Sequence, residues 1–118
     1  MSEERIQGVL ESLKMIKGVH GAAIIEKFGF IKGSALPGWV DPEAVAAMVT
    51  LILKASQRAT KELEQGQFYN AIIESAKGRI LFSEVKGNIL TIIATTDAKL
   101  GIINLKLGAA VEALKEHL

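Results

Sequence analysis

Three short apolar segments follow one another between residues 67 and 96, and the turns between them are very short. The segments are QFYNAIIES at 67–75, RILFSEV at 79–85 and NILTIIATT at 88–96, each rich in the β-branched and aromatic residues of strands. Lys77-Gly78 and Lys86-Gly87-Asn88 are turn signals between them. Parallel pairing requires a crossover connection of about a dozen residues or more. These three strands are therefore predicted to form an antiparallel meander.

Two segments before this meander have the spacing of helices. Apolar residues of the segment 2–17 recur on one helical face. A longer helix is predicted over 41–65, because Asp41 can cap its first turn and Pro42 suits the first helical position. Gly66 is placed to stop this second helix.

A hairpin lies between these helices, with strands over 21–27 and 30–36 joined at Phe28-Gly29. Strands 21–27 and 88–96 are the most apolar and carry apolar residues on both faces. A strand that is buried on both faces lies in the middle of a sheet, with helices above and below it. We therefore place these two strands side by side, which leaves strands 30–36 and 67–75 at the edges.

A last helix is predicted over 97–118, capped by Asp97 or Thr96. The predicted order is α-β-β-α-β-β-β-α. The fold class is α+β, a five-stranded antiparallel sheet with helices on both faces. We expect residues 1–118 to form a single domain with no tail beyond it, since 118 residues suffice for one core.

The two predicted edges differ in character. Strand 30–36 carries Lys32, Gly33 and Ser34, which discourage pairing, whereas strand 67–75 is apolar and therefore invites another strand. The helix segment 44–53 is apolar nearly all round, and a single domain can cover only one side of it. We therefore predict a homodimer whose interface contains Met48, Leu51, Ala55, Phe68, Tyr69, Ile72 and Ile73.

Composition excludes several classes of partner. Fourteen basic and thirteen acidic residues are interspersed, so no concentrated basic patch is available for a nucleic acid. No apolar run approaches the ~18 residues of a spanning helix, so we expect no direct membrane insertion. The start MSEERIQG does not have the pattern of a signal peptide, and the chain contains no cysteine. These features favour a cytoplasmic location.

No reactive constellation is recognisable. Gly18-Val19-His20-Gly21 has the spacing of a glycine loop that clamps RNA backbone, but a strand follows it where a helix is needed. The histidines, His20 and His117, have no ligand-type neighbours at helical or strand spacing. We predict that the chain is not an enzyme and has no catalytic residues, no cofactor and no metal. Lys54, Arg58 and Lys61 form a basic helical stripe, which is either a solvated face or a partner-binding surface.

Several stretches resemble the roadblock family, which is named for a dynein light chain. They are Val19-x-Gly21-Ala22 at the start of the first strand, the Phe28-Gly29 turn, and Thr96-Asp97-Ala-Lys-Leu100-Gly101-Ile102-Ile103 at the last helix. The resemblance covers nearly the whole chain and implies a roadblock/profilin-like fold. It further implies a non-enzymatic protein that dimerises through the middle helix and the third strand. Members bind Ras-like GTPases, motor subunits or membrane-anchored scaffolds.

The resemblance and the residues together predict a homodimeric roadblock-type module that binds and regulates a small Ras-like GTPase. Lys54, Arg58 and Lys61 are the predicted partner-binding residues. Two alternatives remain open at this point. One is a small-molecule sensor domain, which requires a cavity with a few convergent polar groups. The other is a bare dimerisation module of a larger motor or scaffold assembly.

Overall fold

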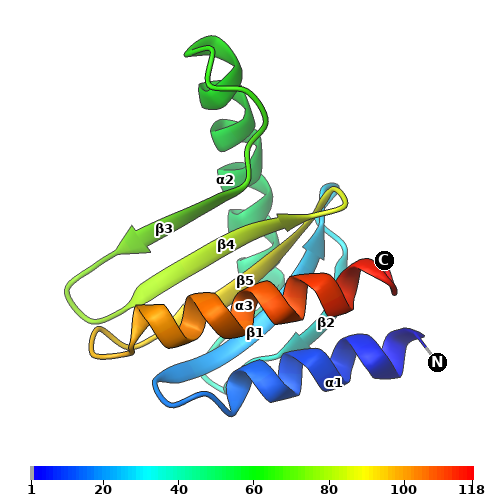
Figure 1. Ribbon diagram of the computed structural model, residues 1–118, viewed down its shortest axis with the longest axis vertical. Helices are drawn as coiled ribbons and strands as arrows, with labels where there is room; N and C mark the ends of the chain where they lie inside the picture. Colours follow the sequence, from blue (N-terminus) through cyan, green and yellow to red (C-terminus); the bar gives the residue numbers. More distant parts are fainter. Residues whose placement is uncertain (1) are drawn as a thin grey trace.

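The computed structural model describes residues 2–118 (Figure 1). The elements follow in the order α-β-β-α-β-β-β-α, which confirms the sequence prediction. They are α1 Ser2–Lys14, β1 Val19–Glu26, β2 Ile31–Ala35, α2 Pro42–Glu62, β3 Asn70–Glu74, β4 Arg79–Val85, β5 Asn88–Ala94 and α3 Leu100–Lys115.

The five strands form one sheet in the order β2-β1-β5-β4-β3, and every neighbouring pair is antiparallel. The central position predicted for the two most apolar strands, β1 and β5, is confirmed. Their register pairs Ile24 with Leu90 and Ile25 with Ile89. All four of these side chains are buried, two on each face of the sheet. The sheet therefore needs a helical layer on both sides.

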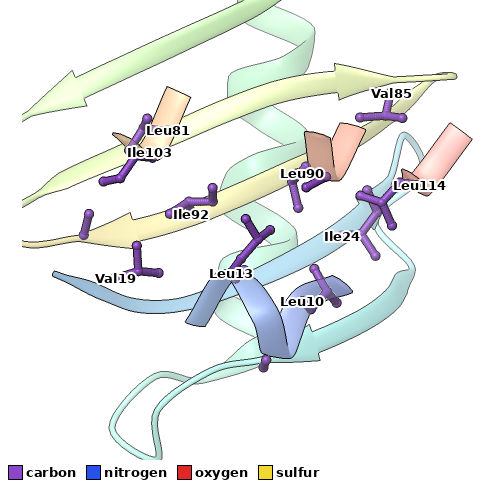
Figure 2. Close-up of a cluster of buried hydrophobic side chains, with 14 of the residues drawn as sticks. Leu10, Leu13, Val19, Ile24, Leu81, Val85, Leu90, Ile92, Ile103 and Leu114 are labelled. Atoms are coloured by element: carbon purple, nitrogen blue, oxygen red, sulfur yellow. The ribbon is translucent and has the colours of Figure 1, made fainter. Parts of the chain in front are cut away.

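Helices α1 and α3 lie on one face of the sheet and α2 lies on the other (Figure 1). The first core packs Leu10 and Leu13 of α1 and Leu114 of α3 against strand residues such as Ile24 and Leu90 (Figure 2). The buried residues of α1 are Ile6, Leu10 and Leu13, and those of α3 are Ile103, Ala110 and Leu114. Their spacings of three, four and seven positions are the amphipathic pattern that the sequence predicted for both helices.

The second core lies beneath α2. Val45, Ala46, Val49 and Leu53 of this helix pack onto Ala23, Ile25, Phe82 and Ile89 of the sheet. Phe68 joins the same core and is only 7% exposed. We predicted Phe68 on an edge strand over 67–75, but β3 begins at Asn70. The prediction was wrong at this end because the Phe68 side chain packs into the second core, whereas its neighbours Gln67 and Tyr69 are exposed. Phe68 therefore belongs to the core of one chain and not to the exposed edge on which we predicted the dimer interface.

The ends of the two later helices differ in how they are capped. Asp41 accepts a hydrogen bond from the backbone N–H of Glu43 at 3.0 Å, and Pro42 follows it, as predicted for α2. The predicted cap of α3 was wrong. Its N-cap residue is Lys99, which makes no side-chain cap hydrogen bond. The Asp97 carboxylate instead accepts a hydrogen bond from the Thr95 hydroxyl at 2.5 Å, so this acid stabilises the preceding turn.

Helix α2 is longer than the strip of sheet it covers. Its first half packs on the second core, whereas its second half extends past β3 at the edge of the sheet (Figure 1). From Lys54 to Glu62 every residue is exposed except Ser56 and Thr60, which are half-buried. The projecting half of α2 therefore has little packing against the rest of residues 2–118.

Candidate protein-interaction surface

One side of α2 presents an apolar row to solvent. Met48 and Ala55 are seven residues apart, so they lie nearly in line along the helix, and Ala59 continues the row one turn later. Met48 is 55% exposed, and the two alanines are exposed as well. Two of the predicted interface residues therefore lie on one accessible stripe of α2.

An apolar groove of about 350 Å³ begins beside Met48 and lies along the first half of α2. Ala44, Met48 and Ile52 of α2 form one wall, and Ile80, Phe82 and Ile93 of β4 and β5 form the floor. Thr91 also lines the groove, and its side-chain hydroxyl is buried with no hydrogen-bond partner among residues 2–118. The groove marks the part of this sheet face that α2 leaves uncovered.

The free edge of the sheet at β3 is apolar on both of its faces. Register with β4 places Ile73 beside Ile80 on the face of α2, and Ile72 beside Leu81 on the opposite face. Ile72 and Ile73 are 44% and 40% exposed, and Tyr69 just before the strand is 68% exposed. Because β3 pairs only with β4, its outer backbone groups have no strand partner within the described chain.

The basic stripe lies on the projecting half of α2. Lys54 and Lys61 are exposed and seven residues apart, and neither belongs to an ion pair among residues 2–118. Arg58 differs, because its Nε lies 2.7 Å from Oε1 of Glu62. Both of these side chains are largely exposed, so the pair adds little stability. The stripe therefore carries two free charges and one that is partly neutralised.

Reactive chemistry is sparse in the described part of the chain. Residues 2–118 contain no group of three or more His, Cys, Asp or Glu side chains that could hold a metal ion. His20 packs its ring edge-on against Trp39, with the ring centroids 5.6 Å apart. The hydrogen bond from Thr95 lowers the pKa of Asp97. Over the same residues, none of the helices has both the length and the apolar character needed to cross a membrane.

Sequence reasoning missed one exposed pair of aromatic residues. Phe28 and Phe30 flank Gly29 in the turn between β1 and β2, and they are 72% and 69% exposed. We assigned them to a turn and a strand without a binding role. The sequence does contain an indication of this pair. Turns are usually built from Gly, Pro, Asn, Asp and Ser, so two phenylalanines at a single turn are unusual.

Comparison with known proteins decides the family. The sequence profile of the Roadblock/LC7 domain matches residues 5–94. The chain belongs to the Roadblock/LC7 family. It is 31% identical over 110 residues to the uncharacterized protein MJ1340 of Methanocaldococcus jannaschii, covering 93% of this chain and 96% of that protein. The resemblance found in the sequence is thereby confirmed.

Solved structures agree on the fold of this roadblock chain. Myxococcus xanthus MglB superposes with a TM-score of 0.91 at 21% identity, covering 97% of this chain and 87% of MglB. An MglB in a tetrameric arrangement superposes with a TM-score of 0.87 at 23% identity, covering 98% of this chain and 89% of that one. At these identities the likeness establishes the shared α+β roadblock architecture.

Proposed function

We propose that this roadblock chain is a non-enzymatic, cytoplasmic homodimer that binds and regulates a small Ras-like GTPase. The proposal has two parts, the dimer and the partner. The dimer is supported by the surfaces of this chain and by the tetrameric arrangement of one MglB. The GTPase is supported by the partners that the roadblock resemblance implies.

Two features carry the dimer: the projecting second half of α2, and the uncovered groove along the first half of the same helix. In a dimer with a twofold axis near β3, both copies contribute the same surface to the interface. Each copy then provides a projecting helix and a groove. The projecting helix of one copy covers the groove of the other. The apolar row of Met48, Ala55 and Ala59 forms the seam between the two helices.

Pairing of the two β3 strands completes this arrangement. It satisfies the free backbone groups of the edge and joins both sheets into one continuous sheet. Ile73 is covered by the partner helix, and Ile72 approaches its symmetry-related copy on the opposite face. Burial of these side chains contributes about 25 cal/mol per Å² of apolar area removed from water. The predicted interface therefore stabilises both the edge strand and the exposed helix.

The GTPase is assigned to the outer face of the paired α2 helices. Lys54 and Lys61 lie off the seam and stay accessible in the dimer, so they remain available to an acidic surface. Exposed charges of this kind steer association more than they add affinity. The partner therefore meets a symmetric platform with an apolar seam below it and basic residues on its rim.

The test is direct binding to purified GTPases. Each Ras-like GTPase of the source organism is loaded with GDP or with a non-hydrolysable GTP analogue and titrated into the chain by calorimetry. We expect one of them to bind with a Kd that differs by about tenfold or more between nucleotide states, a difference of about 1.4 kcal/mol. A translation GTPase serves as the unrelated control. Absence of binding to every Ras-like GTPase in both states, at tens of micromolar, would reject the GTPase assignment.

A further inference from the structure

The turn between β1 and β2 forms a second apolar hollow against α2, on the opposite side of that helix from the groove. Its volume is about 700 Å³. Phe28, Phe30 and Ile31 form one wall, and Ala47, Thr50 and Leu51 of α2 form the other. We call this feature, defined by these six residues, the aromatic hollow.

The turn that forms one wall of the aromatic hollow lies next to α2 at Gly29. This glycine has a φ of +96°, a conformation that side chains rarely adopt, and a Cβ built there would lie 3.5 Å from Oγ1 of Thr50. The turn therefore rests against α2, and both flanking phenylalanines are directed to solvent rather than into the core. Leu51 is also 69% exposed. Large apolar side chains that gather on an exposed surface in this way are typical of an interaction site.

The aromatic hollow is distinct from the proposed dimer seam. Ala44, Met48 and Ile52 line the groove, whereas Ala47, Thr50 and Leu51 line the hollow. The two sets share no residue and form two stripes along α2, which come closest where Leu51 adjoins Met48 and Ala55. Phe28 and Phe30 do not line the groove, so a second copy that fills only the groove leaves these two rings uncovered. Leu51, which we predicted in the dimer interface, lines the hollow instead of the groove.

The charges around the aromatic hollow indicate what kind of surface fits it. Nζ of Lys27 lies 5.2 Å from the centre of the Phe28 ring. Lys54 is one helical turn from Leu51, and neither lysine belongs to an ion pair within residues 2–118. Glu43 is the one carboxylate that lines the hollow. The complementary surface therefore has an apolar side chain at its centre and acidic residues around it.

We propose that the aromatic hollow is the anchor point of the protein partner, and that it takes an apolar side chain of the GTPase surrounded by acidic residues. This inference rests on the proposed function. Aromatic residues dominate the energetics of most interfaces, whereas exposed charges contribute mainly to the rate of association. The phenylalanines therefore set the affinity of the complex, and Lys27 and Lys54 set how fast it forms.

The test uses the double variant Phe28→Ser/Phe30→Ser and the GTPase that binds the wild-type chain. Leu105→Ser is the matched control, because Leu105 is 75% exposed and lies on α3, across the sheet. We expect the double variant to raise the Kd about tenfold or more and the control to change it less than about twofold. Light scattering of both variants checks that the dimer is intact. Leu51→Ser, on the opposite wall, is expected to weaken binding in the same way.

Three results would overturn the inference, and they are distinguishable. If the wild-type chain binds no Ras-like GTPase, the proposed function is wrong, and so is the proposal that a GTPase side chain occupies the aromatic hollow. If a GTPase binds wild type and the double variant equally, the GTPase assignment stands and the hollow is not its anchor. If the double variant becomes monomeric, a second copy of this chain covers the hollow.

Discussion

At Gly21 the backbone of β1 passes so close to the end of β2 that no side chain fits. A Cβ built there would lie 2.6 Å from the carbonyl oxygen of Ala35 and 2.9 Å from Cδ of Pro37. Gly8 of α1 is the opposite case, because it is exposed and a Cβ there would meet nothing within 4 Å. Spacing along the sequence does not distinguish these two glycines, since the difference depends on which segments cross in space.

We predict opposite changes in stability for alanine at these two positions. Gly21→Ala should lower the free energy of unfolding by about 1–3 kcal/mol, the usual cost of overpacking. Gly8→Ala should raise it by about 0.5–1 kcal/mol, because alanine favours the helix more than glycine does. Urea unfolding followed by circular dichroism measures both. A gain in stability for Gly21→Ala would contradict the packing described around Gly21, and a loss for Gly8→Ala would contradict the open surface at Gly8.

At the scale of elements, α2 and β3 together form the proposed dimer interface. Met48→Asp and Ile73→Asp each place a carboxylate in a contact that has no basic partner in the proposed arrangement. Burying an unpaired charge costs several kcal/mol, on the order of a thousandfold or more in the dimer dissociation constant. We therefore predict that both variants are monomeric at concentrations where the wild-type chain is a dimer, as analytical ultracentrifugation can measure.

Lys32→Glu is the matched control for the edge. Lys32 is exposed on β2, at the other edge of the sheet, so its reversal should change dimer stability by about half a kcal/mol or less. Circular dichroism of all three variants checks that the fold is retained. Loss of the dimer in Lys32→Glu, with retention in Ile73→Asp, would place the interface at β2 instead of β3.

The basic stripe on α2 makes a separate prediction about the rate of complex formation. Lys54→Glu/Arg58→Glu should slow association with the GTPase, change dissociation little and leave the dimer intact. Exposed charges act over about 8–10 Å at physiological salt, so the difference from wild type should shrink as salt is raised. Stopped-flow measurements at two salt concentrations test this. An unchanged association rate at low salt would place the partner on another face, of which the one covered by α1 and α3 is the next candidate.

At the scale of the whole molecule, the topology was predictable from connection lengths and from which strands are apolar on both faces. Short turns forced the β3-β4-β5 meander, and the burial of β1 and β5 placed them at the centre. The cap at Asp41 was predictable because it depends on adjacent residues. Phe68 was misplaced because its burial depends on packing between α2 and the sheet. Asp97 was misplaced for a local reason, because its carboxylate accepts a hydrogen bond from Thr95 instead of capping α3.

The candidate surface was predictable only in part. An apolar helix and an apolar edge strand are visible in the sequence, and both are exposed in the structure. The groove and the aromatic hollow on either side of α2 were not visible, because each combines residues from segments far apart in the chain. Which residues of α2 line the groove and which line the aromatic hollow depends on the direction in which the helix crosses the sheet. The sequence pattern does not define that direction.

The mass of the chain in solution tests the central claim most directly, because the platform for a partner exists only if two copies join. Light scattering coupled to gel filtration should give twice the 12.7 kDa of one chain at micromolar concentration. It should give the single-chain mass for Met48→Asp under the same conditions. A wild-type mass of 12.7 kDa across the whole range up to hundreds of micromolar would contradict the dimer and, with it, the platform on α2.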